Sequence, residues 1–362
     1  MQDPTVSLFF DLVKIDSPTG NEKKVSDFVY KKLKAISNNV YVDKHWNVYA
    51  FFQGTGTPIA FSAHFDTVEP GRGIKPLVRK GYAVSDGKTI LGADNKAALA
   101  SLLRIASVLS KNKQHRPVEL LLTVGEEKDS RGAMRFDYSK LKSAECLCFD
   151  SSNQPMGTII IGSPAYETVD IHIIGRNAHA SKPELGINAL ASAGTFINGV
   201  KMGFFDDITA FNLGIVNGGN VRNTIIGEIT LLGEIRGFTE SGITSCKKHI
   251  LSSLKKSSKK HGTKYKISFR RETPPYLLDR ESAGKLIGYV ERCMVAEGMK
   301  PSLKRIWGIS DSNTFNSKGI LSLNISNGVQ NAHTQRERIK ISDIERINEL
   351  MLRLAGAKAV GL

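Results

Sequence analysis

The chain has 362 residues, with 50 Lys and Arg against 35 Asp and Glu, so its formal charge at pH 7 is +15. Hydrophobic residues make up 41% and charged residues 23%, which is the composition of a globular protein and excludes a disordered or fibrous one. No run of about 18 uninterrupted apolar residues occurs, which excludes a membrane-spanning helix. At roughly 150 residues a domain, the length predicts about two domains.

The first residues do not resemble a secretory signal, because Asp3, Asp11 and Asp16 interrupt their short apolar runs. The four cysteines are too few and too scattered for a disulfide framework, and we interpret them as reduced thiols of the core. Both features predict a cytoplasmic protein.

The excess of positive charge, taken alone, is a feature of nucleic-acid-binding proteins. Its densest segment is residues 247–260, but Ile243, Ile250 and Leu254 recur in this region at helical spacing. The lysines are therefore predicted to form the solvated face of an amphipathic helix. No aromatic residues alternate with them, so we expect no nucleic-acid partner.

Helices and strands alternate in the first 165 residues. An apolar stripe from Val25 to Leu33 predicts an amphipathic helix, with Thr19 or Asn21 as its N-cap. Apolar runs predict strands at residues 58–64, 118–124 and 146–149, and a buried helix at residues 96–109. This alternation predicts an α/β fold with helices on both faces of the sheet.

The pattern changes at about residue 166, where Val169, Ile171 and Ile173 alternate with polar residues. A helix near residues 187–200, strands near 208–216 and 224–236, the lysine-bearing helix and a strand at 265–269 follow. The order strand, helix, strand, strand, helix, strand is that of the ferredoxin-like plan. We predict an inserted α+β ferredoxin-like domain over residues 166–272.

The end of the chain returns to the first pattern. It carries a predicted strand at residues 320–325 and a last helix for which Ser342 and Glu345 form a capping box. Pro274-Pro275 is the predicted return hinge. Residues 1–165 and 273–362 are therefore expected to form one α/β domain around the insertion.

Potential metal ligands follow four of the predicted strands and begin the buried helix; they are His64, Glu126-Glu127, Asp150, His333 and Asp94. Each alone has a simpler explanation, such as an N-cap for Asp94 or a solvated turn for the two glutamates. Ligands in open α/β sheets collect beyond the carboxyl ends of the strands, so the joint occurrence of these residues favours a metal site.

Two histidines and three carboxylates exceed the four ligands of one tetrahedral zinc ion, but they suit two divalent ions that share a bridging carboxylate. Such a pair holds a water molecule whose pKa lies near neutrality. One of the adjacent residues Glu126 and Glu127 can bind metal while the other moves the proton of that water to a leaving amine. Asp66, two residues after His64 on an extended segment, is placed to orient the imidazole.

At this point the sequence resembles a known family. The segments concerned are Ser62 to Val68, Leu91 to Ala98, Gly125 to Glu127, and Asn331 to Thr334 with Glu337. They are similar to the zinc exopeptidase family of peptidase T, carboxypeptidase G and aminoacylase, and most similar to its tripeptidase T branch. The resemblance runs from about residue 7 to residue 355. It implies a mixed-sheet catalytic domain with an inserted lid domain, and two zinc ions, with cobalt or manganese as alternatives.

The resemblance also implies a role for each metal-site residue. His64 and Asp150 would hold one zinc ion, Glu127 and His333 the other, and Asp94 would bridge them. Glu126 would be the general base, and Asp66 the acid that orients His64.

For the inserted domain, the resemblance implies that His179 stabilises the oxyanion, in several relatives at the partner subunit's site. Asn223 and Arg236 would hold the substrate, including its carboxylate, and Asp311 would lie on a substrate-side loop. A guanidinium suits this role because its planar fork matches a carboxylate.

Together these features predict a cytoplasmic metal-dependent hydrolase that cleaves amide bonds of short peptides, and specifically an aminopeptidase acting on tripeptides. A homodimer through the lid domain is a further expectation, and no membrane partner is expected. The alternatives are an N-acyl amino-acid deacylase or a carboxypeptidase of the same family, or an inactive binding homologue.

Overall fold

A computed structural model describes residues 4–357, and its contacts divide the chain into two units. The first unit runs to Ile161 and is completed by Leu278–Ile306 and by the chain from Ser310 onward. The second unit comprises Gly162–Leu277 with the short segment Trp307–Ile309. The insertion expected at residues 166–272 lies inside this second unit.

The first unit is built on a mixed sheet in the order β1-β2-β6-β3-β7-β18-β8, with β17 also pairing with β8. Strand β16 and the last two residues of β8, with which it pairs, belong to the second unit. The central strands β6, β3, β7 and β18 are parallel, so their carboxyl ends meet at one edge. The bounds of the strands are β1 Val40–Val42, β2 Val48–Phe52, β3 Ile59–His64, β6 Val118–Thr123, β7 Glu145–Ser151, β8 Thr158–Ser163, β16 Tyr276–Leu277, β17 Ser302–Arg305 and β18 Leu321–Ser326.

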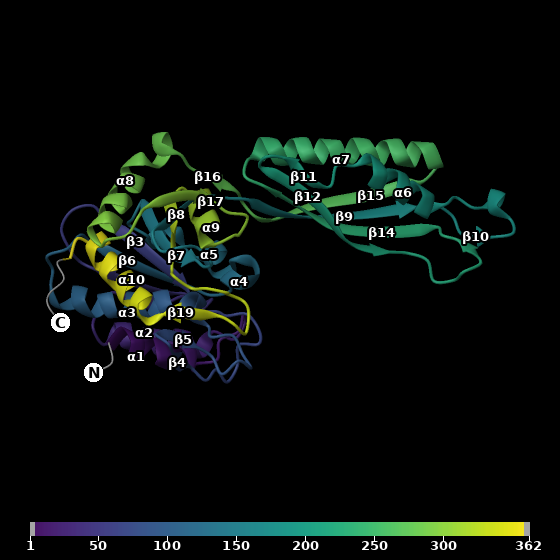
Figure 1. Cartoon of the computed structure of the whole chain (residues 1–362). Coiled ribbons are helices and arrows are strands. Elements are labelled where there is room, and N and C mark those ends of the chain that lie inside the picture. Colours follow the sequence, from purple (N-terminus) through teal and green to yellow (C-terminus); the bar gives the residue numbers. More distant parts are fainter. Residues whose placement is uncertain (1–3, 358–362) are drawn as a thin grey trace. The chain divides into compact units, whose positions relative to one another are not determined.

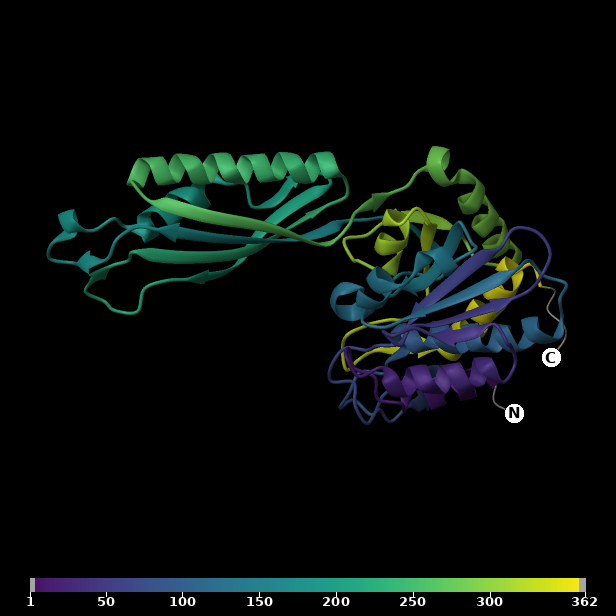
Figure 2. The ribbon, with the colours of Figure 1, turned by 180° about the vertical axis from the view of Figure 1, so that it is seen from behind.

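Helices cover both faces of this sheet (Figures 1 and 2). Successive residues of a strand point to opposite faces, so Phe61 packs in the larger apolar cluster and Ala60 in the smaller one. This explains why β3 and β6 are buried along their whole length. The larger cluster contains α1 (Pro4–Val13), α2 (Lys23–Lys34), α3 (Ala93–Lys111), α8 (Arg280–Ala296) and α10 (Ile341–Leu354), and the smaller one α5 (Arg131–Arg135) and α9 (Asp311–Ser317).

Helix α3 is the predicted buried helix, and it extends three residues further toward the N-terminus than the apolar run. Even Lys96 is fully buried in it, and its Nζ donates a hydrogen bond of 2.7 Å to the carbonyl oxygen of Ile15. The helix follows Gly92, whose positive φ of 72° suits a residue without a side chain. This turn directs Asp94 toward the carboxyl edge of the sheet.

The second unit has the predicted ferredoxin-like topology. Its antiparallel sheet has the order β11-β12-β14-β9-β15, and α6 (Ala189–Gly199) and α7 (Glu240–His261) lie together on one face (Figure 1). The strands are β9 Ala165–Ile174, β11 Gly203–Asp206, β12 Thr209–Asn217, β14 Glu228–Gly237 and β15 Lys264–Thr273. Strands β11 and β10 (Ala178–His179) were not expected from the sequence, and the strand predicted at 224–236 is divided into β13 (Thr224–Ile225), which pairs with β10, and β14.

Two predicted helix caps are wrong. Helix α10 starts at Ile341 with Lys340 as its N-cap, so Ser342 lies inside the first turn and forms no capping box. Helix α2 has Glu22 as its N-cap, and the hydroxyl of Thr19 instead donates a hydrogen bond to Asp66. The remaining short elements are α4 (Glu126–Asp129), η1 (Tyr138–Lys140), η2 (Pro183–Leu185) and a small sheet of β4 (Leu77–Arg79), β5 (Tyr82–Val84) and β19 (Arg338–Lys340).

Within residues 4–357, no helix has the length and apolar character needed to cross a membrane. The lysine-rich segment forms most of α7, and its apolar residues Ile243, Ile250 and Leu254 are buried as the spacing predicted.

Candidate metal centre

The four parallel strands bring the predicted ligands to one edge of the sheet. His64 is the last residue of β3, and Asp150 is near the end of β7. Glu127 lies just after β6, and His333 lies in the loop between β18 and β19. His333 has a positive φ of 66°, a conformation that is rare outside glycine and concentrated at functional sites.

His64, Glu126 and Asp150 form one group of potential ligands. The Nε2 atom of His64 lies 3.1 Å from Oδ1 of Asp150 and 3.9 Å from Oε2 of Glu126. The imidazole is buried, and its Nδ1 atom lies 2.9 Å from the carbonyl oxygen of Asp66. This contact directs Nε2 toward the carboxylates.

Asp94, Glu127 and His333 form a second group. The Nε2 atom of His333 lies 2.9 Å from Oε2 of Glu127 and 3.6 Å from Oδ2 of Asp94. The imidazole is half exposed, whereas the two carboxylates are buried to more than nine-tenths.

Asp94 links the two groups through its two carboxylate oxygens. Oδ1 lies 3.7 Å from Nε2 of His64, and Oδ2 lies 3.6 Å from Nε2 of His333. Oδ1 is buried and has no hydrogen-bond partner among the described residues. A buried carboxylate oxygen without a partner is costly, and a cation on each side of Asp94 would remove that cost.

The electrostatics of the cluster also fit cations. Burial raises the pKa of Asp150 to about 7, and the nearby charges of Asp94 and Glu127 add to this effect. Burial, followed by the charge of Asp150, also raises the pKa of Glu126 well above its ordinary value. The donor set of imidazoles and carboxylates is the one that zinc, cobalt and manganese accept. The residues present therefore fit a pair of divalent ions.

Asp66 contacts more of the site than the imidazole that it was predicted to orient. Its carboxylate oxygen is 3.4 Å from Nδ1 of His64, which is longer than the 2.9 Å contact of its own carbonyl oxygen. The carboxylate is fully buried and accepts the backbone N–H groups of Glu126 and Glu127 at 3.0 and 3.1 Å and the hydroxyl of Thr19 at 2.8 Å. Asp66 therefore holds both His64 and the two glutamates.

Glu337 is a further supporting residue to which the sequence alone gave no role. Its buried carboxylate accepts the backbone N–H groups of Leu91, Gly92 and Asp94, each at 2.9 Å. The signal available in the sequence was a carboxylate four residues after His333, but nothing in its pattern indicated the partner loop.

Two of the predicted substrate residues meet in the second unit. Nε2 of His179 lies 3.4 Å from Nδ2 of Asn223, and Nδ1 lies 2.7 Å from the hydroxyl of Ser181. Both are outside the five-stranded sheet: His179 is the last residue of β10, and Asn223 directly precedes β13.

Arg236 lies apart from that pair. It is near the end of β14, where its guanidinium contacts Glu234, the carbonyl oxygen of Trp307 and the ring of Tyr166. The ribbon adjoins the opposite end of β14, because Gly227 bonds to Asn177 and to Gly175.

Asp311 contacts the end of the strand that precedes the two glutamates. It begins α9, is 1% exposed, and accepts a hydrogen bond of 2.5 Å from the hydroxyl of Thr123 at the end of β6. Burial raises the pKa of Asp311 to about 6. This buried position favours support of the segment that follows β6 over direct contact with a substrate.

Known proteins share this architecture along the whole chain. The structure of aminopeptidase PepT from Bacillus cereus has a TM-score of 0.93 and 28% identity and covers 98% of both chains. The structure of a tripeptidase from Staphylococcus aureus has a TM-score of 0.92 and 28% identity and covers 97% of both. A dinuclear metal-binding peptidase of the M20 family from Bacillus subtilis, at 16% identity and a TM-score of 0.77, shares the fold.

Sequence comparison leads to the same group. An uncharacterized protein of Bacillus subtilis, YqjE, is 29% identical over 95% of both chains. Peptidase T of Haemophilus influenzae is 27% identical over 79% of this chain and 69% of its own. Residues 60–357 match Peptidase family M20/M25/M40, and the chain therefore belongs to this family, within its peptidase T-like branch.

Proposed function

We propose that this protein is an aminopeptidase that hydrolyses tripeptides with two bound divalent ions, most naturally zinc. The observation that carries the proposal is the position of Asp94, with one carboxylate oxygen directed at each histidine. The likeness to an aminopeptidase and to a tripeptidase along the whole chain supports the choice of substrate.

In this proposal, His64 and Asp150 would hold one ion, Glu127 and His333 would hold the other, and Asp94 would contribute a carboxylate oxygen to each. The two ions would supply Lewis acidity and lower the pKa of a bound water. Asp66 and Glu337 would keep the ligand-bearing loops in place through backbone N–H groups.

Glu126 is the proposed general base. Its carboxylate is buried near His64 and Asp150, and its Oε2 atom lies 3.9 Å from Nε2 of His64, too far for a hydrogen bond. Glu127, in contrast, lies 2.9 Å from Nε2 of His333. Glu126 would take a proton from the attacking water and pass it to the leaving amine.

The second unit would supply groups that bind the substrate. Arg236 would hold a substrate carboxylate, and His179 with Asn223 would stabilise the developing oxyanion. Along β14, Arg236 lies eight positions after Glu228, which at a rise of about 3.3 Å per residue is roughly 26 Å. A tripeptide spans at most about 11 Å. Arg236 and the His179–Asn223 pair of one copy of this unit therefore cannot both contact the same substrate.

We therefore propose a homodimer in which His179 and Asn223 act at the partner's metal centre. Strand β12 supports an interface on the second unit, since Ile215 and Val216 are exposed there and β11 pairs only with its first residues. The four buried, unpaired cysteines support a cytoplasmic location for such an enzyme.

A comparison of three substrates tests the reaction. The zinc-loaded protein should release the N-terminal residue of trialanine, and it should fail on N-acetyl-trialanine, because an aminopeptidase requires the free amine. A preference for the acetylated peptide would identify a deacylase, and release of the C-terminal residue from both would identify a carboxypeptidase. Tetra-alanine as the third substrate would measure the preference for length.

A further inference from the structure

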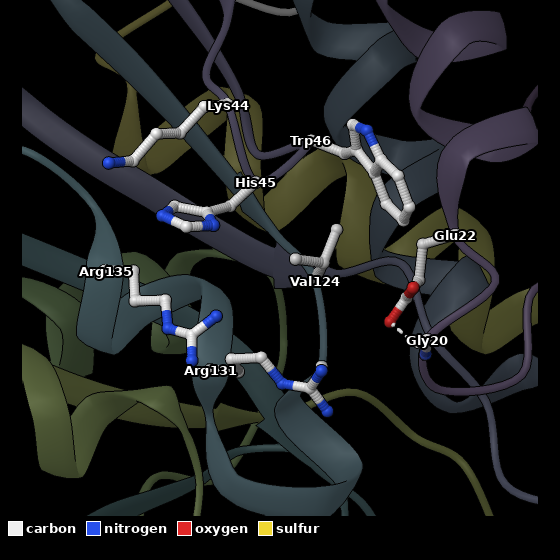
Figure 3. Close-up of a pocket in the computed structure, with 9 residues that line it drawn as sticks. Gly20, Glu22, Lys44, His45, Trp46, Val124, Arg131 and Arg135 are labelled. Carbon is white, nitrogen blue, oxygen red and sulfur yellow. Dashed lines mark hydrogen bonds between the residues drawn. The ribbon is translucent and has the colours of Figure 1, made fainter.

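A pocket of about 220 Å³ lies in the first unit, next in sequence to Glu126 (Figure 3). Val124 and Gly125, which precede Glu126, form one part of its wall, and Lys44, His45 and Trp46 form another. Because β2 runs antiparallel to β6, with Val48 opposite Leu122, the turn that carries Lys44 stands at the carboxyl end of β6. The pocket therefore opens at the same edge of the sheet as the metal ligands.

The two walls of this pocket are joined by Asn47. Its side chain accepts the backbone N–H of Val124 at 3.1 Å and donates to the carbonyl oxygen of Gly132 at 3.0 Å. Asn47 is 1% exposed, and Asp43 fixes it by a further hydrogen bond of 2.7 Å. The pocket is thus preformed, and a ligand would not have to order it.

The charges on its rim are unbalanced. Lys44 and Arg135 line the pocket, and within residues 4–357 neither side chain has a hydrogen bond or an ion pair. The acid of the pocket, Glu22, is 2% exposed and accepts the backbone N–H of Gly20 at 2.9 Å. In Figure 3 this carboxylate lies across the pocket from Lys44 and Arg135. One side of the pocket therefore offers two unpaired cations to an anion.

Trp46 adds an aromatic surface to the rim. It is 37% exposed and adopts a φ of 73°, which is unusual for a residue with a large side chain. Its backbone is held by a hydrogen bond from Ser26 to its carbonyl oxygen at 2.8 Å. Strained residues of this kind persist where the surrounding structure fixes them, often at ligand sites.

We infer that this pocket is a substrate subsite that binds a carboxylate of the peptide, through Lys44 and Arg135, while the scissile bond lies at the metal centre. The inference rests on the proposed function and specifies its substrates further. The volume suits one residue rather than a large ligand, since pockets for drug-sized molecules begin at about 300 Å³. The carboxylate belongs either to an acidic side chain or to the C-terminus of the peptide.

Kinetics with matched peptides distinguish these two sources. Trialanine carries a carboxylate only at its C-terminus, and its C-terminal amide carries none. Amidated peptides with Glu in place of one Ala carry a carboxylate only on the side chain. Lys44→Gln and Arg135→Gln should each raise KM about threefold for the peptides that carry the recognised carboxylate, with unchanged kcat, and by roughly tenfold together. KM for the carboxylate-free peptide should not change.

Lys113→Gln is the matched control, because it removes an exposed charge near the start of β6, at the other end of the strand. The inference is overturned if the pocket substitutions affect carboxylate-free peptides equally, or if they act no more strongly than this control.

A binding measurement separates failure of the subsite from failure of the proposed reaction. The chain has two tryptophans, so Trp307→Phe leaves Trp46 as the reporter within the pocket. In that background, with Glu126→Gln to prevent turnover, a carboxylate-bearing tripeptide should change the emission of Trp46 saturably. Lys44→Gln with Arg135→Gln should weaken this binding by roughly tenfold. No change in emission, or an equal response to the carboxylate-free peptide, would contradict the subsite even if the enzyme hydrolyses tripeptides.

Discussion

The carboxylate of Glu337 accepts the backbone N–H of Asp94 at 2.9 Å, although 243 residues separate them in the chain. The same carboxylate also binds the N–H groups of Leu91 and Gly92, so it fixes the loop that leads to Asp94. Since Glu337 lies four residues after His333, it couples the two loops that carry ligands of the second group. The placement of Asp94 between the two groups therefore depends on a residue outside both of them.

We predict that Glu337→Ala weakens binding of the second metal ion by about 10- to 100-fold. The substitution leaves three buried N–H groups without an acceptor, at a cost of roughly 1–3 kcal/mol each, so the melting temperature should also fall. Titration of the apoprotein with zinc in the presence of a competing chelator measures the affinity. Glu345→Ala, an exposed change in α10, is the control and should alter neither quantity. Unchanged zinc affinity in Glu337→Ala would exclude the positioning role.

The convergence of the candidate metal ligands could be predicted because each one follows a local pattern. His64 and Asp150 end apolar runs that could only be buried strands, and parallel strands bring their carboxyl ends together. The alternation of Val169, Ile171 and Ile173 likewise predicted one buried face of β9, which the second unit confirms.

The supporting contacts could not be predicted, because they join a side chain to distant backbone groups. Asn47 binds Val124 and Gly132, and Glu337 binds Leu91 to Asp94, without any periodic pattern in the sequence. The cap of α2 was misplaced for the same reason. Thr19 is a good N-cap by type, but its hydroxyl binds Asp66 across the fold.

We predict that Glu126→Gln abolishes turnover while the two metal ions remain bound. The amide keeps the shape of the side chain but cannot accept a proton, so kcat should fall by about 10²- to 10⁴-fold. Metal content per chain, measured on the same preparation, should match that of the wild type. Glu127→Gln provides the contrast, because loss of the partner of His333 should lower metal content as well as activity. Loss of metal in Glu126→Gln would make this residue a ligand rather than the base.

We predict that removal of the metal ions lowers stability as well as activity. The buried Oδ1 atom of Asp94 then has no partner, and the carboxylates of the two groups repel one another. Binding at 100 to 1,000 times the dissociation constant stabilises the folded state by about 2.7–4.1 kcal/mol. Zinc should therefore raise the melting temperature of chelator-treated protein, and Asp94→Asn should lose most of this increase. An equal increase in Asp94→Asn would argue against the bridge.

If His179 of each subunit acts at the metal centre of the other, two inactive variants should complement one another. Glu126→Gln lacks the base, and His179→Ala lacks the oxyanion donor and should lose about 10²- to 10³-fold in kcat. If His179 acts at the partner's centre, a heterodimer of the two variants has one intact site, formed by Glu126 of one chain and His179 of the other. Heterodimers isolated through two different affinity tags should then show about half of the wild-type activity.

The pair Glu126→Gln and Asp94→Asn is the control for this experiment. Both residues belong to the first unit, so each centre of that heterodimer retains one defect and no activity should return. If His179 instead acted on the metal centre of its own chain, the first heterodimer would also stay inactive, because each chain would carry its own lesion. Recovery in the first pair and not in the second therefore distinguishes catalysis across the dimer from catalysis within one chain, and failure to isolate any doubly tagged species would exclude the dimer itself.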